Sequence, residues 1–297
     1  MNHPLIHSRE CFHSYMGLWA IHSPILLAGV RSFMAGSLSR QAVDEEDTYD
    51  LTEDGIAIVR LHGTMMKARS KFGGVSTIET RREIRRAVAD QAVRGIMVHV
   101  DSPGGSVAGT SDLADDLRAA NLAKPVHVHA DDTMASAAYW VASGARRITA
   151  NRTGQVGSIG AMAVVEDTSK AYAADGIAVH VVTSAGAEVY KGAFVDGREV
   201  SAEQLAYLKS MVNEAGAAFV ADIAKERGGR RNLSLDDATK LADGRMHSAD
   251  DARKLGLIDA VESFDQAMAA MRADLDVDAM RKRRRNTMAE LRMKEIS

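Results

Sequence analysis

The sequence feature that most constrains the fold is the run DSPGGSV, Asp101 to Val107, directly behind the apolar stretch IMVHV, Ile96 to Val100. The stretch predicts a short buried strand, because it is rich in β-branched residues and bounded by turn residues. Pro103 then fixes φ, and Gly104 and Gly105 allow backbone angles that a β-carbon would forbid. A helical pattern follows in VAGTSDLADDLRAANLA. A glycine pair between strand and helix exposes N–H groups that can hold an oxyanion, although the same arrangement also occurs in α/β proteins without chemistry there.

A candidate nucleophile follows in the segment MASAAYWVASGARRITAN. Ser136 stands among small residues at the expected start of a helix. Small neighbours let a substrate carbonyl approach, and the next N–H group, that of Ala137, can join the oxyanion donors. The alternative is a serine N-cap whose alanine neighbours serve helix packing, and the spacing alone leaves both interpretations open.

A nucleophilic serine needs a base, and the histidines offer no obvious one. His127 and His129 alternate with valines on one face of a predicted strand, His180 lies in the apolar pattern IAVHVV, and His247 lies in a predicted turn. A structural histidine with a satisfied ring explains the strand histidines, and a surface-turn histidine explains His247. Lys191, in SAGAEVYKGAF, has apolar neighbours, and a lysine can act as a base when burial lowers its pKa. A solvated lysine is the alternative.

Six segments occur in an order that resembles the signal peptide peptidase A family of Ser-Lys peptidases. The similarity is greatest to the branch that tailed phages encode as the prohead, or capsid assembly, protease. The segments extend from about Gly55 to about Met271 and read GIAIVRLHGTM, DSPGGSV, MASAAYWVASGARR, TGQVGSIGAM, VYKGAF and DGRMHSADDARKLGLIDAV.

The resemblance implies a role for particular residues of this chain. Ser136 matches the family nucleophile and Lys191 the general base. The implied oxyanion hole consists of Gly104, Gly105 and Ala137, and the residues near the substrate groove are Gly157 and Ser158.

Two departures from the family pattern accompany this assignment. Many family members have glycines after the nucleophile, where this chain has Ala137 and Ala138. The segment around Lys191 is also less regular, and the nearest other lysines are Lys170 and Lys209.

The remaining pattern predicts the α/β class. A first strand in IAIVRLHGTMM precedes an amphipathic helix in TIETRREIRRAVADQAVRG, and strands and helices then alternate to about Leu257. Such alternation favours a largely parallel sheet with right-handed crossovers. A long helix is expected over Ser201 to Gly228. The resemblance implies the Clp protease/crotonase-like fold, with repeated ββα units and flanking helices.

Three regions follow from these patterns. Residues 1–54 are expected to form an N-terminal extension with an acidic linker, residues 55–271 the peptidase domain, and residues 272–297 a polar, basic tail. The tail contains the basic run Arg281 to Arg285, for which a solvated surface is expected.

Composition narrows the class of partner. The net charge of −3 and the pI of about 6.4 argue against nucleic acid as a main partner. The one cysteine, Cys11, excludes an internal disulfide and suits a reducing cytoplasm. The histidines lack paired-ligand spacing, so we expect no metal and no cofactor. The N-terminal apolar stretches are interrupted by His22, Pro24 and Arg31, so we expect neither a membrane span nor a signal peptide.

The resulting hypothesis is a phage prohead serine endopeptidase with a Ser136–Lys191 dyad. It would cleave scaffold, portal or major capsid proteins, and itself, in the host cytoplasm or inside the assembling prohead, as a homo-oligomer that the resemblance implies to be a ring. Alternatives are a soluble cellular signal-peptide-degrading peptidase of the same family, a non-catalytic scaffold protein, and a crotonase-type acyl-CoA enzyme.

Overall fold

A computed structural model describes residues 17–23, 49–68 and 74–296. Cys11 and residues 43–48 of the predicted acidic linker lie outside these ranges. In the described ranges, no helix combines the length and the apolarity needed to cross a bilayer.

The main sheet is largely parallel. Its strands are β2 (Asp50–Leu51), β3 (Ile56–His62), β6 (Gly95–Ser102), β8 (Val126–Ala135), β9 (Arg147–Ala150), β10 (Gln155–Gly157), β11 (Met246–Ser248) and β12 (Ala260–Val261). They follow the order β11-β10-β8-β6-β3-β2, with β9 beside β8 and β12 beside β9. The central pairs are parallel, whereas β2 and β11 pair antiparallel with their neighbours. The predicted α/β class with a largely parallel sheet is therefore confirmed.

A small second sheet lies at one end of the main sheet. It consists of β1 (Trp19–Ile21), β7 (Gly104–Ser106), β4 (Met65–Met66) and β5 (Val75–Ser76), in the order β1-β7-β4-β5. The glycines of DSPGGSV, predicted as a turn between a strand and a helix, thus form a strand with neighbours on both sides. Within residues 1–54, the predicted N-terminal extension and acidic linker, Trp19–Ile21 is buried as part of this sheet.

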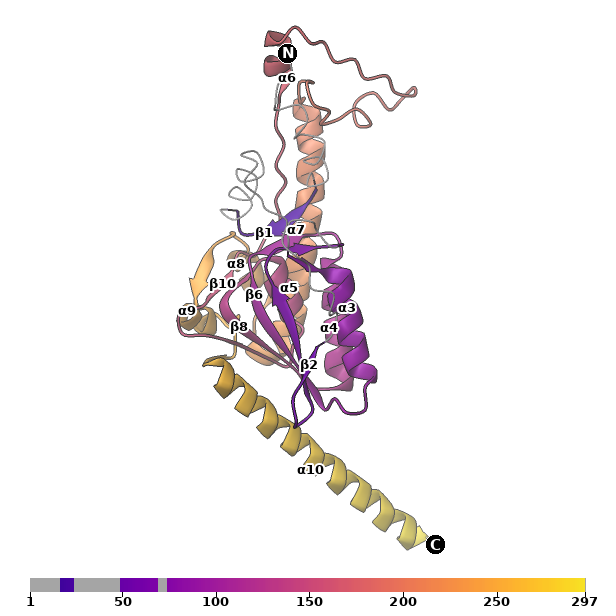
Figure 1. Cartoon of the computed structure of the whole chain (residues 1–297), viewed down its shortest axis with the longest axis vertical. Helices are drawn as coiled ribbons and strands as arrows, with labels where there is room; N and C mark the ends of the chain where they lie inside the picture. Colours follow the sequence, from indigo (N-terminus) through magenta and orange to yellow (C-terminus); the bar gives the residue numbers. More distant parts are fainter. Residues whose placement is uncertain (1–16, 24–48, 69–73, 297) are drawn as a thin grey trace.

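Helices cover both faces of the main sheet. Successive side chains of a strand point to opposite faces, so one strand contributes to the packing on both sides. In β3, Ala57 and Val59 face the main core, on the side of α3 (Thr77–Ala89) and α4 (Thr110–Ala123). Ile56 faces the other way, into a smaller cluster with Met268 and Met271 of α10 (Phe264–Ile296). Figure 1 shows α3 and α4 side by side along the body, and α10 leaving it towards the C-terminus. The helix α10 continues without a break through the segment that the sequence marked as a polar tail.

The helix predicted over Ser201 to Gly228 is confirmed as α7 (Ala202–Arg231). Ser201 caps it, since its hydroxyl accepts the N–H of Gln204 while the Gln204 side chain accepts the N–H of Ser201. One half of α7 packs on the body, and the other projects from it towards α6 (Ser169–Ala174) (Figure 1). Two short helices, α8 (Leu235–Leu241) and α9 (Ala249–Lys254), follow it.

Residues 166–200, here called the arm, lie at the projecting end of α7 (Figure 1). The alternating pattern IAVHVV, residues 177–182, predicts a strand in the arm, but the structure contains none there, so that prediction is wrong for the single chain. A strand needs a neighbour to satisfy its backbone, and this segment is largely exposed, with Val182 at 95%.

Candidate active site

Three parallel strands end at the same edge of the main sheet, and each delivers a predicted site residue there. The strand β8 ends immediately before Ser136, β10 ends at Gly157, and β6 ends two residues before Gly104. The registers agree, since Gly157 lies opposite Ala135 and Ser102 opposite Met134. The fold therefore brings the nucleophile candidate and the glycines together, although they are far apart in sequence.

Ser136 occupies a sharp turn between β8 and α5 (Ala137–Ala142). Its backbone has φ 54° and ψ −118°, a region that non-glycine residues rarely adopt. Its N–H donates to the carbonyl of Gly157 at 2.7 Å, and the Trp140 N–H donates to its carbonyl at 2.9 Å. A strained strand-to-helix turn of this kind presents the serine of a nucleophile elbow.

The Ser136 hydroxyl is held in this turn without a hydrogen-bond partner among the described residues. The residue is only 1% exposed, and its neighbours Ala135, Ala137 and Ala138 are fully buried. An unpaired buried hydroxyl is unfavourable for stability, so such a group at the end of a strand indicates a functional site.

The strain at Ser136 leads to a stability prediction. Ser136→Gly should be more stable than Ser136→Ala by about 1 kcal/mol, because glycine adopts positive φ without a Cβ penalty. In the regular helix α5, Ala138→Gly should instead lower the stability by about 1 kcal/mol. Urea unfolding of the wild type and the three variants measures both differences. A Ser136→Gly variant less stable than Ser136→Ala would contradict the strained turn.

The predicted oxyanion donors differ in their surroundings. A Cβ added to Gly104 would stand 2.9 Å from the Ala137 nitrogen, so these two residues lie side by side. The Gly104 N–H donates to the Ser102 hydroxyl at 3.2 Å, and that hydroxyl donates to the carbonyl of Gly63 at 2.6 Å. Gly105 is packed against Met65, whose carbonyl oxygen would lie 1.8 Å from an added Cβ. Gly105 is therefore needed for close packing, while Gly104 lies beside the residues on either side of Ser136.

Gly157 and Ser158 also lie at the site. Gly157 has φ 135°, and an added Cβ would stand 2.6 Å from the carbonyl oxygen of Arg245. Ser158 is buried with φ 51°, and its N–H donates to the same Arg245 carbonyl at 2.7 Å. This segment holds Ser136 in place through the Gly157 carbonyl.

Lys191 lies in the arm, and the structure does not bring it to Ser136 within one chain. It is exposed, and its neighbours are tied to the first turn of α7: the Gln204 side chain donates to the Val189 carbonyl at 2.6 Å. The turn after Ser136 instead contacts the packed half of α7, where the Trp140 ring stacks on Phe219 at 4.7 Å. Gln204 and Phe219 are about 22 Å apart along α7, at about 1.5 Å per residue. The apolar neighbours of Lys191 therefore do not bury it in the single chain.

Among the four histidines singled out from the sequence, His127 and His129 have a described side-chain partner, although the second ring nitrogen of each is buried without one. His127 lies 3.0 Å from Asp274, and its pKa is lowered because burial outweighs the effect of that carboxylate. His129 lies 2.9 Å from the Thr149 hydroxyl, and burial lowers its pKa to about 4. His180 lies in the arm. His247 was expected in a surface turn, but it is half-buried in β11, opposite Val156 and beside Gly157, and its Nε2 has no described partner.

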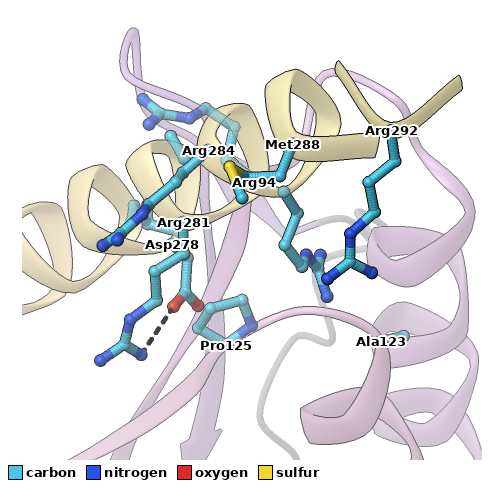
Figure 2. A pocket seen from close by; sticks show the side chains of 11 residues that line it. Arg94, Ala123, Pro125, Asp278, Arg281, Arg284, Met288 and Arg292 are labelled. Carbon is cyan, nitrogen blue, oxygen red and sulfur yellow. Dashed lines mark ion pairs between the residues drawn. The ribbon is translucent and has the colours of Figure 1, made fainter. Parts of the chain in front are cut away.

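A separate pocket lies between α10 and the body, around Pro125. Figure 2 shows Arg94, Arg281, Arg284 and Arg292 around it, and Arg285 also lines it, together with apolar residues such as Met288 and Leu275. Asp278 forms an ion pair with Arg281 at 3.7 Å. The pocket contains no serine and none of the predicted site residues, so the basic run does not contribute to the candidate active site.

Two features of the site were missed from the sequence. Ser102, within the run DSPGGSV, links Gly104 to Gly63 through its hydroxyl. The strand β1 pairs with the site glycines, and only its apolar letters WAI could have indicated a strand.

Comparison with known proteins shows the family of the chain. The model of peptidase family S49 matches residues 118–278, more than half of the chain. The head-tail preconnector protein GP5 of Enterobacteria phage P21 is 28% identical over 93% of this chain and 52% of its own length. Capsid assembly protease C of Escherichia phage lambda is 28% identical over 75% of this chain and 50% of its own length. Protease 4 of Salmonella typhi is 29% identical over 72% of this chain and 34% of its own length. The chain thus spans about half, or less, of the length of these relatives.

Proposed function

The chain belongs to peptidase family S49, and from this premise we propose that it is a serine endopeptidase with Ser136 as its nucleophile. Membership confirms the family resemblance drawn from the six sequence segments and, with it, the Clp/crotonase-like class of the fold. The single observation that carries the proposal is the conformation of Ser136, a strained turn with a buried hydroxyl that has no described partner.

The geometry supports the following reaction. The Ser136 Oγ attacks the carbonyl carbon of a peptide bond and passes its proton to a base. The Ala137 N–H donates to the oxyanion and stabilises it. The Gly104 N–H becomes a second donor when it exchanges its bond to the Ser102 hydroxyl for one to the oxyanion. The amine leaves with the proton that the base received, and an acyl-serine remains. Water, deprotonated by the same base, then releases the acid and regenerates Ser136.

We infer that the base is Lys191 of a neighbouring copy of the chain. Its position at the far end of α7 supports a shared site, because the dyad is incomplete within one chain. A lysine also has to be desolvated before it can act as a base, and Lys191 is exposed in the single chain. A neighbouring subunit would supply both the proximity and the desolvation.

The surface of the arm supports this assembly. Exposed large apolar side chains gather in the arm and on the projecting half of α7, and they are Ile177, Val182, Tyr190, Val195, Leu205 and Tyr207. Exposed apolar patches of this kind mark protein–protein contacts. A head-to-tail contact between copies closes into a ring when the rotation permits, which agrees with the proposed homo-oligomer.

The phage relatives favour a role in capsid assembly. The similarity to the phage P21 protein extends over 93% of this chain, against 72% for Protease 4. We therefore propose that the substrates are scaffold, portal or major capsid proteins and the chain itself, cleaved in the host cytoplasm or the assembling prohead. The second candidate is a cellular signal-peptide-degrading peptidase, which the similarity to Protease 4 supports.

A substrate comparison separates the two candidates. The purified full chain is incubated with the scaffold and capsid proteins encoded beside its gene and, separately, with synthetic signal peptides. Cleavage of the scaffold or capsid protein, mapped by mass spectrometry and absent with Ser136→Ala, is the expected result. Cleavage of signal peptides alone would favour the cellular role, and cleavage of neither class by an assembled, folded protein would contradict the proposal.

A further inference from the structure

The strand β1 lies along the edge at which Ser136 is presented. It pairs antiparallel with β7, so that Trp19 lies opposite Ser106, Ala20 opposite Gly105, and Ile21 opposite Gly104. The pairing continues beyond the strand at both ends. The His22 N–H donates to the Pro103 carbonyl at 2.8 Å, and the Val107 N–H donates to the Leu18 carbonyl at 2.9 Å.

The other edge of β1 is also occupied. The Trp19 N–H donates to the Met162 carbonyl and the Met162 N–H donates to the Trp19 carbonyl, both at 2.8 Å. Met162 follows the Gly157–Ser158 segment that holds Ser136. The strand β1 is therefore bonded through its backbone to the two chain segments that flank the nucleophile.

The central carbonyl of β1 lies next to the oxyanion donors. A Cβ at Gly104 would stand 2.3 Å from the Ala20 oxygen and 2.9 Å from the Ala137 nitrogen. The Ala20 carbonyl, the Gly104 backbone and the Ala137 amide thus surround one point. With β1 in this position, Ser136 is only 1% exposed.

These contacts are the ones that a peptide substrate requires. An extended peptide binds a protein as an added β-strand, with affinity from its backbone and specificity from alternate side chains. We propose that β1 occupies the peptide-substrate groove of Ser136, so that the chain carries its own occluding segment and a substrate has to displace it. This inference rests on the proposed function, because it assigns the groove to that nucleophile.

The side chains of β1 then indicate the substrate class. Trp19 and Ile21 point to one side of the strand and Ala20 to the other, where it joins the main core cluster. All three side chains are almost fully buried, with exposures of 4% for Trp19, 0% for Ala20 and 5% for Ile21. The groove therefore suits an extended segment with a small residue between two large apolar ones.

The test uses the full chain with Ala20→Pro, which removes the N–H at the centre of the pairing. Leu51→Pro, in the short and exposed edge strand β2, is the matched control. Two quantities are measured. One is the rate at which a fluorophosphonate probe labels Ser136, and the other is the affinity for a synthetic peptide of residues 17–23.

Ala20→Pro should be labelled about tenfold faster than the wild type, or more, because the accessible fraction of the site limits the apparent rate. It should also bind the peptide about tenfold more tightly than the wild type, whose tethered β1 competes at high effective concentration. A peptide with Ala20→Trp should not bind, since its central side chain is too large. Ile21→Ser, which keeps every backbone donor, should shift both quantities in the same direction, and it replaces Ala20→Pro if that variant does not fold.

The outcomes separate the two claims. If the β1 variants match Leu51→Pro and the wild type in both labelling rate and peptide affinity, β1 does not occlude the groove and the inference is overturned. If the β1 variants gain peptide binding but Ser136 remains unlabelled in every form, the groove assignment stands and the proposed nucleophile fails.

Discussion

Replacing Ser136 by alanine should lower the rate of proteolysis by about 10⁴-fold or more and leave the fold intact, because the attacking oxygen is removed. Alanine fits the site, since small buried residues already surround it. The measurement is cleavage of an identified protein substrate followed on a gel, together with thermal unfolding of both forms.

The matched control is Ser143→Ala at the other end of α5. Ser143 is fully buried, and its hydroxyl donates to the Trp140 carbonyl at 2.7 Å, so the change removes a buried serine outside the site. It should retain activity, with a stability lower by about 1 kcal/mol. Undiminished cleavage by Ser136→Ala, with contaminating proteases excluded, would remove Ser136 from the mechanism.

The second large effect concerns Lys191. Lys191→Ala should be as inactive as Ser136→Ala, and Lys191→Arg should be inactive too, because a guanidinium cannot be deprotonated to act as a base. Lys209→Ala, at an exposed lysine of α7, should retain activity. Substantial activity of Lys191→Arg would exclude Lys191 as the base.

A mixture of the two inactive variants tests whether the dyad is shared between subunits. In rings assembled from equal amounts of Ser136→Ala and Lys191→Ala, roughly a quarter of the interfaces combine an intact serine with an intact lysine. Activity should therefore return to about a quarter of the wild-type level after the variants are mixed under conditions that exchange subunits. If exchange is demonstrated and activity stays at background, the shared site is excluded while the Ser-Lys chemistry remains possible.

The sequence predicted most of what local pattern and burial decide. The stretch Ile96 to Val100 lies within β6, and the capped pattern after Ser201 is α7. Ser136 was found because its small neighbours precede a helix. These features depend on hydrophobic periodicity and on capping, both of which act over short distances in the chain.

The features that sequence could not predict depend on distant partners. Trp19–Ile21 becomes a strand only because β7 and Met162 offer two backbone edges, and three apolar letters do not reveal that pairing. Conversely, the strand pattern of residues 177–182 remains unpaired in the single chain, which agrees with a role of the arm in contacts between copies. The separation of Lys191 from Ser136 likewise follows from the length of α7 and not from their spacing in sequence.

The most direct test of the central claim is to locate a fluorophosphonate label on assembled wild-type protein that cleaves its substrate. Trypsin should yield the labelled fragment of residues 119–146, which contains both Ser136 and Ser143, and tandem fragmentation then distinguishes the two serines. The account predicts a single label on Ser136, with loss of activity in proportion to labelling. A label on any other residue, or full inactivation without a label on Ser136, would contradict it.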